Sequence, residues 1–126
     1  METEGNLALS NYGSNSGLFN AQKFTLYRLY FGTNIGLDKV IPADELNLFI
    51  ESTVSKFFPF GCTILRGTGQ WLGETGIVKE GNWILEIFSM TPDETEEKLF
   101  KISELYKFMF KQEAVLFMKS EVLASF

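Results

Sequence analysis

Four polar side chains stand within or directly beside apolar stretches of the chain, where a charge has to be paired or used. Arg28 and Tyr30 interrupt the stretch "LYRLYFG", Glu86 interrupts "WILEIF", and Arg66 follows "TIL". Arginine donates strong, charge-assisted hydrogen bonds to carboxylate and phosphate groups, and a tyrosine hydroxyl can add another. We therefore expect a site for a small anion or carboxylate, with the two arginines as its ligands.

Catalytic chemistry is restricted by the near absence of two side-chain types. The sequence has no histidine and a single cysteine, Cys62. Histidine is the most common acid–base catalyst near neutral pH and the most common metal ligand. A Ser-His-Asp or Cys-His arrangement is therefore excluded, no internal disulfide can form, and a structural zinc site is not expected. We predict no metal and no cofactor, and Glu86 lacks a second acid with which to act catalytically.

The overall charge disfavours nucleic acids as partners. The 126 residues suit one domain with its own core, and they carry 16 acidic against 11 basic side chains. Non-specific affinity for nucleic acid depends on clustered Lys and Arg, so we expect no DNA binding.

The start, "METEGNLALS", lacks the basic and apolar regions of a secretory signal. No stretch approaches the roughly 18 apolar residues that span a bilayer, so we predict a cytoplasmic protein without membrane contact.

The elements that position these side chains follow from apolar spacing and from glycine and proline. Residues 1–21 are rich in Asn, Ser and Gly and indicate a flexible tail, which leaves residues 22–126 as a single domain. Apolar and β-branched residues predict four strands, over 23–32, 60–73, 76–90 and 113–122. Helical spacing predicts two helices, over 42–59 and 91–112.

Each predicted helix has an apolar stripe, and the second has a clear start. Thr91 is expected to cap this helix, with Pro92 at its first position and Glu94 completing a capping box. Its inner stripe comprises Leu99, Ile102, Tyr106 and Met109. The stripe of the first helix comprises Leu46, Phe49, Ile50, Thr53 and Phe57.

The resulting order, β-α-β-β-α-β, predicts an α+β fold. Two right-handed βαβ crossovers with interleaved strand pairs give a ferredoxin-like sandwich. In this sandwich a four-stranded antiparallel sheet carries two helices on one face, and its other face is open.

Strand alternation assigns the candidate side chains to the faces of this sheet. A charged residue in the middle of a strand avoids the helix-covered face, so Arg28 and Tyr30 are expected on the open face, as is Glu86. Because their strands are neighbours in this fold, Arg28 and Glu86 are expected to pair, with Arg66 joining them. The alternative to an anion site is a simple ion pair that stabilises the sheet by about 1 kcal/mol at most.

The open face also carries the apolar residues Leu26, Ile84 and Phe88. Such a face rarely stays wet in a monomer, so we predict a homo-oligomer that pairs its sheets back to back. On the second helix, Phe100 and Phe108 point away from the inner stripe. They form a second candidate interface, for a partner or for the N-terminal tail.

The stretch "RGTGQWLGETG" packs four glycines between the second and third strands. It lacks the Gly-Lys-Ser/Thr ending of a phosphate loop, and no helix follows it. We expect its glycines to permit a bulge or a positive φ. We also expect Trp71 to pack at the end of the sheet and Gln70 to bind loop backbone. The alternative is a ligand pocket beside these two side chains.

Three segments, "LYRLYFG", "GTGQW" and "ELYKFMFKQEAVLFMKS", resemble motifs of a known family. The family is the bacterial domain of unknown function numbered 3574, with its "YFG", "GxGQW" and "AYKxxFxQExVL"-like elements. The matching residues are Tyr30, Phe31, Gly32, Gly67, Gly69, Gln70, Trp71, Tyr106, Lys107, Phe110, Gln112, Glu113, Val115 and Leu116. The resemblance extends over residues 23–119 and implies a ferredoxin-like fold. Because the family is uncharacterised, it implies no activity and no catalytic residue.

Three functions remain open. The leading one is a non-catalytic module that binds a small ligand or a protein and oligomerises through its open face. The second is an enzyme of the dimeric α/β-barrel type, acting on a small apolar substrate without metal or heme. The third is an RNA-binding domain, because "LYFGTNI" is similar to the first aromatic motif of RNA-recognition domains. RNA binding is disfavoured, since Asn82 and Ile84 take the open-face positions where further aromatic residues are required.

Overall fold

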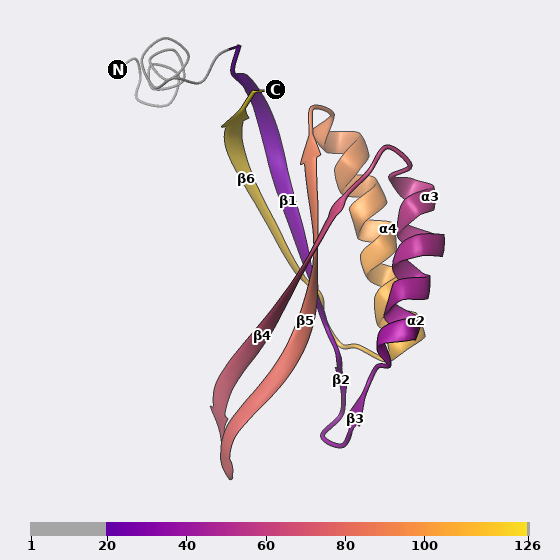
Figure 1. Cartoon of the computed structure of the whole chain (residues 1–126), viewed down its shortest axis with the longest axis vertical. Helices are drawn as coiled ribbons and strands as arrows, with labels where there is room; N and C mark the ends of the chain where they lie inside the picture. The colour runs from indigo at the N-terminus through magenta and orange to yellow at the C-terminus, as the bar shows by residue number, and fades with distance from the viewer. Residues whose placement is uncertain (1–19, 126) are drawn as a thin grey trace.

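The computed structural model describes residues 20–125 and has the predicted α+β architecture (Figure 1). Four strands form one antiparallel sheet in the order β4-β5-β1-β6. Their bounds are Gln22–Gly32 for β1, Thr63–Gly73 for β4, Gly76–Ser89 for β5 and Leu116–Ala124 for β6. The helical segments lie on one side of this sheet. The ferredoxin-like prediction is therefore confirmed, whereas most of the predicted tail, residues 1–19, lies outside the described residues.

The core lies between the sheet and the helices and is rich in aromatic rings. The two central strands bury the side chains that alternation predicted, namely Tyr27, Leu29, Phe31, Trp83, Leu85 and Ile87. Phe31 stacks on Tyr106 of the last helix with 4.4 Å between ring centroids. The Tyr106 hydroxyl donates a 2.6 Å hydrogen bond to the carbonyl of Gly32. Burial raises the pKa of this hydroxyl, with a further contribution from Glu80, so the group stays protonated as a donor.

The first helix contains a π-helical segment. Helix α2 (Ala43–Leu48) continues through η1 (Phe49–Val54) into α3 (Ser55–Phe57). A π turn holds about one residue more than an α turn, so it rotates the buried face relative to a regular helix. Val54 is fully buried and Thr53 is only partly buried, which corrects the stripe predicted from regular spacing.

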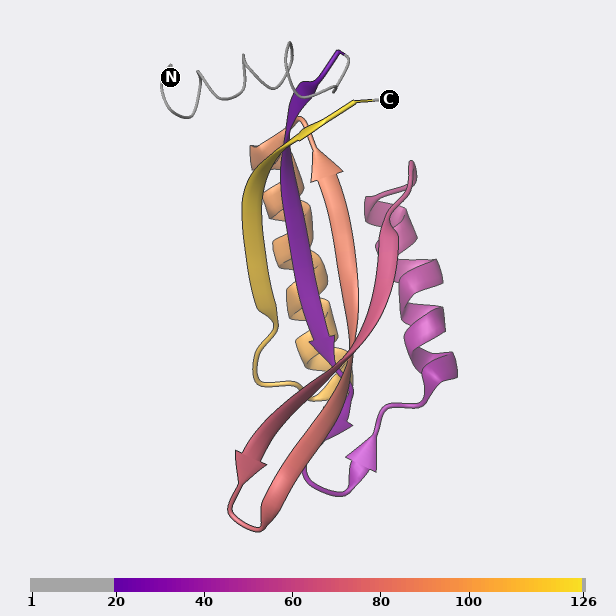
Figure 2. The same cartoon turned by 60° about the vertical axis from the view of Figure 1, so that its left-hand side comes forward.

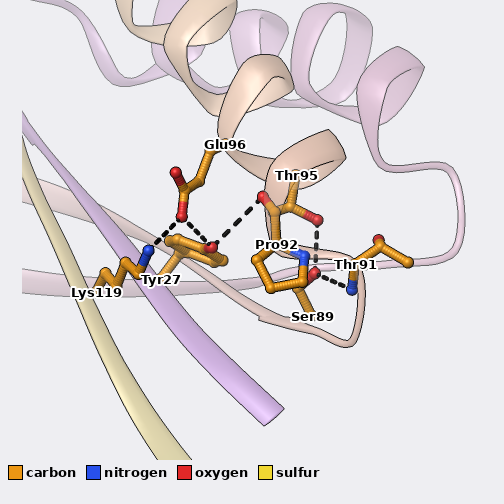
Figure 3. Close-up of polar contacts among 7 residues, drawn as sticks. All are labelled: Tyr27, Ser89, Thr91, Pro92, Thr95, Glu96 and Lys119. Carbon is orange, nitrogen blue, oxygen red and sulfur yellow. Dashed lines mark hydrogen bonds and ion pairs between the residues drawn. The ribbon is translucent and has the colours of Figure 1, made fainter.

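The last helix, α4 (Pro92–Phe110), starts where the sequence predicted, but the hydrogen bonds at its start differ from those expected. The Thr91 side chain makes no capping hydrogen bond, so the predicted capping box is wrong. Ser89 substitutes for it from the end of β5 (Figure 3). The Ser89 hydroxyl accepts a 2.9 Å hydrogen bond from the backbone N–H of Thr91 and lies 2.6 Å from the Thr95 hydroxyl.

The inner stripe of α4 also needs one correction. Leu99, Ile102 and Tyr106 are fully buried, as predicted. Met109 is 52% exposed, and Phe110 takes the next inner position at 6%. Phe110 is four residues after Tyr106 and stays on the helix face that contacts the sheet. Met109 is three residues after Tyr106 and lies on the side of the helix that turns towards solvent.

The connection from β1 to α2 forms a small hairpin that the sequence did not predict. Strand β2 (Asn34–Ile35) pairs with β3 (Lys39–Val40), and Gly36 in the turn adopts a φ of 62°. This hairpin places Val40 and Ile41 beside the start of the first helix.

The β4–β5 hairpin extends past the other strands as a two-stranded arm, residues 68–81 (Figures 1 and 2). Strand β5 pairs with β1 only from Asn82 onward but pairs with β4 as far as Gly76. The register is unbroken from Thr63 to Gly73, so the predicted bulge is absent. Within "RGTGQWLGETG" the positive φ, 131°, belongs to Gly76 beside the turn. The stretch is an edge strand followed by a tight turn.

Candidate functional site

The centre of the open sheet face holds the predicted ion pair. Arg28 and Glu86 are directly opposite in the pairing of β1 with β5. The Arg28 Nη2 and Nε atoms lie 2.7 and 2.8 Å from the same oxygen, Oε2 of Glu86. Hydrogen bonds with Tyr30 and then with Glu86 raise the pKa of the Arg28 guanidinium. The expected pairing is therefore confirmed, and the charge of Arg28 is neutralised within the chain.

Arg66 does not join this pair, which corrects the prediction. It lies opposite Trp83 in the pairing of β4 with β5, and Trp83 faces the helices. The Arg66 guanidinium carbon lies 4.0 Å from the centre of the Trp83 ring. Register decides the outcome, because residues directly opposite in a sheet share one face. The two arginines thus lie on opposite faces and cannot bind one small anion together.

Gln70 and Trp71 lie in the arm and away from the ion pair. Gln70 is an exposed residue of β4 opposite Lys79, so it does not bind the backbone of a loop as predicted. Trp71 is 49% exposed and does not pack into the end of the sheet. Both expectations failed because the stretch continues as a strand beyond the body of the fold.

A pocket of about 450 Å³ opens beside Glu86, and we call it the open-face pocket. Its lining residues are Phe24, Phe60, Gly61, Cys62, Thr63, Glu86, Ile87, Phe88 and Ala124. The lining is mostly apolar, and Glu86 is its one charged residue. Cys62 is an exposed residue, and partial desolvation raises the pKa of its thiol, which disfavours the nucleophilic thiolate.

A second depression, of about 570 Å³, lies between β4 and the start of the first helix, and we call it the Arg66 groove. Its lining residues are Thr33, Val40, Ile41, Pro42, Ala43, Leu46, Arg66, Gly67, Thr68, Gly81, Asn82 and Trp83. Arg66 is the one charged residue in this lining. The groove depends on the β2–β3 hairpin and on the register of β4, neither of which the sequence predicted.

The signature glycines of β1 and β4 make room for polar side chains of β5. A Cβ on Gly32 would lie 2.7 Å from Oε2 of Glu80, and that oxygen accepts a 2.8 Å hydrogen bond from the backbone N–H of Asn34. A Cβ on Gly67 would lie 2.8 Å from Oδ1 of Asn82. The sequence did not identify Glu80 or Asn82 as candidate site residues, although each lies close to a glycine of the family motifs.

The predicted interface residues fall on two surfaces. Leu26 and Ile84 are half-buried on the open face, where Phe88 is 50% exposed. Leu116 of β6, opposite Tyr30, adds an apolar side chain that is 64% exposed. Phe100 and Phe108 are 61% and 85% exposed on α4, so they point away from the core as predicted.

A further polar cluster ties α4 to the edge of the sheet (Figure 3). The Tyr27 hydroxyl donates a 2.6 Å hydrogen bond to Oε2 of Glu96, and the Lys119 ammonium lies 2.7 Å from the same oxygen. Burial and then the Glu96 carboxylate raise the pKa of Tyr27, so its hydroxyl stays protonated. Tyr27 and Lys119 share one oxygen of Glu96, so the cluster connects β1, β6 and α4.

Residues 20–125 contain neither a metal-binding cluster of side chains nor a helix that could span a membrane. No group of three or more Cys, Asp or Glu side chains in this part of the chain could hold a metal ion. No helix there is long and apolar enough to cross a bilayer.

The comparisons with known proteins identify a fold and a family. No curated protein matches the chain significantly. A phage SAM lyase in the apo state is similar with a TM-score of 0.61 and 17% identity, over 82% of this chain and 86% of that chain. A phage SAM lyase in complex with S-methyl-5'-thioadenosine is similar with a TM-score of 0.57 and 18% identity, over 80% of this chain and 90% of that chain. At these identities the likeness concerns the fold. The family model described as "Protein of unknown function (DUF3574)" matches residues 26–126, so the chain belongs to this family, as its motifs indicated.

Proposed function

We propose that this protein is a non-catalytic module that self-associates through the open face of its sheet and holds a small ligand on that face. The composition of the face carries the proposal. Phe88 and Leu116 are 50% and 64% exposed there, while the central charges of Arg28 and Glu86 neutralise one another. Such a face can be buried against an identical face with its two central charges already paired, and closed dimers use one patch twice.

The arm supports self-association independently. A two-stranded hairpin is marginally stable in water by itself. Among residues 20–125 the arm meets other strands only at its base, where Thr33 and Asn34 donate hydrogen bonds to Gly81 and Glu80. Beyond this base it exposes Trp71, Leu72 and Ile77 by 49%, 77% and 58%. Trp71 shares the strand parity of the open face. A partner seated on that face would cover Trp71 and stabilise the arm.

The open-face pocket is the proposed place for the ligand. Its volume of about 450 Å³ lies within the range of small-molecule sites. The carboxylate of Glu86, oriented by Arg28, is suited to a hydrogen-bond donor on an otherwise apolar molecule. The anionic ligand predicted from the sequence does not suit this pocket, because its charge would meet Glu86.

Light scattering of matched variants tests the self-association. The double variant Phe88→Ser/Leu116→Ser changes the open face, and Phe100→Ser/Phe108→Ser makes the same chemical change on α4. At micromolar concentrations we expect the unaltered protein and the α4 variant to be oligomers and the open-face variant to be a monomer. A monomeric unaltered protein would refute the proposal. Dissociation of the α4 variant with an intact open-face variant would assign the interface to α4.

Thermal shift tests the ligand site. Small apolar amines and amides are expected to raise the melting temperature of the unaltered protein but not that of Glu86→Gln. Glu113→Gln, an exposed residue between α4 and β6, serves as the matched control. Equal shifts in all three proteins would place the ligand elsewhere.

The fold likeness to phage SAM lyases favours a second candidate, an enzyme acting on a small substrate. Incubation with SAM, followed by mass spectrometry for S-methyl-5'-thioadenosine, tests this candidate. Product above that of a heat-denatured sample would replace the non-catalytic proposal. We expect none.

A further inference from the structure

We infer that the Arg66 groove binds a small organic anion, a carboxylate or phosphate ester with a short apolar body. This site lies on the helix-covered side of the sheet. It therefore goes beyond the self-association and the open-face pocket, and it can fail or succeed without them.

The groove carries a single positive charge. Arg66 is the one charged side chain in its lining. The ion pairs among residues 20–125 join other side chains, so Arg66 has no carboxylate partner there, in contrast with Arg28. The chain as a whole is acidic, with 16 acidic and 11 basic residues. The groove differs from the rest of the protein, because its one charged side chain is a cation without a carboxylate partner. Arg66 would attract an anion that enters the groove, and no negatively charged side chain in the lining would repel it.

Arg66 is positioned in the groove by a contact with Trp83. Its guanidinium carbon lies 4.0 Å from the centre of the Trp83 ring, and Trp83 is only 8% exposed and belongs to the core. The ring attracts the cation without supplying a carboxylate or carbonyl acceptor, so the contact leaves the charge of Arg66 without an anionic partner. A guanidinium fixed in this way loses less conformational entropy when it binds a carboxylate or a phosphate.

The lining around Arg66 is mostly apolar. Ile41 and Leu46 are each 2% exposed and give the groove an apolar floor beside Trp83, while Val40 is 64% exposed at its rim. The Thr33 hydroxyl is occupied by a 2.9 Å hydrogen bond to the carbonyl of Gly81. The floor therefore suits hydrocarbon, and Arg66 suits an anionic head. A volume of about 570 Å³ accommodates a molecule of that kind.

Isothermal titration calorimetry with hexanoate, hexyl phosphate and hexanamide tests this site in the full chain. The first two probes distinguish a carboxylate from a phosphate head, and hexanamide keeps the body but has no charge. We expect at least one anion to bind and hexanamide to bind at least about tenfold more weakly, because the charge-assisted hydrogen bonds to Arg66 are lost. Binding of hexanamide equal to that of both anions, or no binding of either anion at millimolar concentration, would overturn the inference.

Two variants locate the site. Arg66→Met retains an apolar stem over Trp83 and removes the charge, and it is expected to weaken binding of the anion about tenfold or more. Lys56→Met removes the same charge from an exposed residue of α3 outside the groove and should bind as the unaltered protein does. Equal affinity of Arg66→Met and Lys56→Met would also overturn the inference. If Arg66→Met fails to fold, the comparison of the anions with hexanamide decides.

The two tryptophans of the chain provide a second readout. Trp71→Phe removes the indole of the exposed arm and leaves Trp83 under Arg66 as the sole reporter. Titration with the binding anion is expected to change its fluorescence with the affinity that calorimetry gives. An anion that binds without changing Trp83 fluorescence would lie elsewhere, and the assignment to this groove would be wrong.

Discussion

The Tyr27 hydroxyl donates a 2.6 Å hydrogen bond to the carboxylate of Glu96, and so a fully buried side chain of β1 connects the sheet to the first turns of α4. The receiving oxygen is shared with Lys119 of β6, so three elements meet at one atom. This arrangement fixes the start of the helix whose inner stripe covers the centre of the sheet.

Tyr27→Phe is expected to lower the free energy of unfolding by about 1 kcal/mol, because the hydrogen bond disappears while the ring and its packing remain. Urea denaturation followed by circular dichroism measures this change. The control is the same substitution in a Glu96→Ala background, where the hydroxyl has already lost this acceptor, and there Tyr27→Phe should cost clearly less. An equal loss in both backgrounds would contradict the importance of the contact.

Stability is expected to fall in acid through the same contact. Hydrogen bonds from Lys119 and then from Tyr27 lower the pKa of Glu96 below its ordinary value of 4.5. A carboxyl group whose pKa is lower in the folded state stabilises the fold above its unfolded pKa. That contribution is lost as the pH falls through the folded pKa. In Glu96→Gln the melting temperature should therefore fall less steeply with decreasing pH below pH 4.5. Glu97→Gln changes an exposed neighbour and should leave this pH dependence unaltered. Identical acid profiles of the two variants would contradict this assignment.

The Arg28–Glu86 pair is expected to behave as a coupled unit. The Glu86 side chain is 12% exposed and that of Arg28 is 33% exposed, so removing Arg28 leaves a largely buried carboxylate without its partner. Arg28→Met should therefore lower the melting temperature more than the double variant Arg28→Met/Glu86→Leu. Strictly additive single and double effects in a double-mutant cycle would show that the pair is not coupled.

The sequence predicted the fold well because its signals are local and repeated. Alternation in β1 and β5 placed Arg28 and Glu86 on one face, and helical spacing found most of both inner stripes. The position of Arg66 could not be predicted in the same way. Gly67, Thr68 and Gly69 give β4 no apolar alternation, so only its pairing with β5 decides which face Arg66 occupies. The rotation of the first helix at Val54 depends on a π turn, which regular spacing does not indicate.

The glycine of the "YFG" motif leads to a further prediction. Gly32→Ala would place a Cβ 2.7 Å from Oε2 of Glu80, and moving that carboxylate would break its 2.8 Å hydrogen bond with Asn34. We expect a loss of about 1 kcal/mol in the free energy of unfolding. Gly69→Ala is the control, because the nearest atoms to its Cβ would be at 3.6 Å and 3.7 Å. In a Glu80→Ala background, Gly32→Ala should cost nothing more. If Gly32→Ala still lowers the free energy of unfolding in that background, the added methyl group clashes with a residue other than Glu80.

The arm provides an optical test of the proposed assembly. Trp71 is 49% exposed in a single chain, whereas Trp83 is 8% exposed within the core. If a second copy covers the open face and the adjoining arm, dilution should return Trp71 to water and shift the emission of the unaltered protein to longer wavelength. Trp71→Phe should show no shift, because Trp83 stays buried in the monomer and in the oligomer. Quenching by acrylamide should increase on dilution for the same reason and in the same protein only. An emission maximum that is constant while light scattering reports dissociation would mean that the copies separate at a surface that leaves the arm uncovered. The arm would then have no part in the interface.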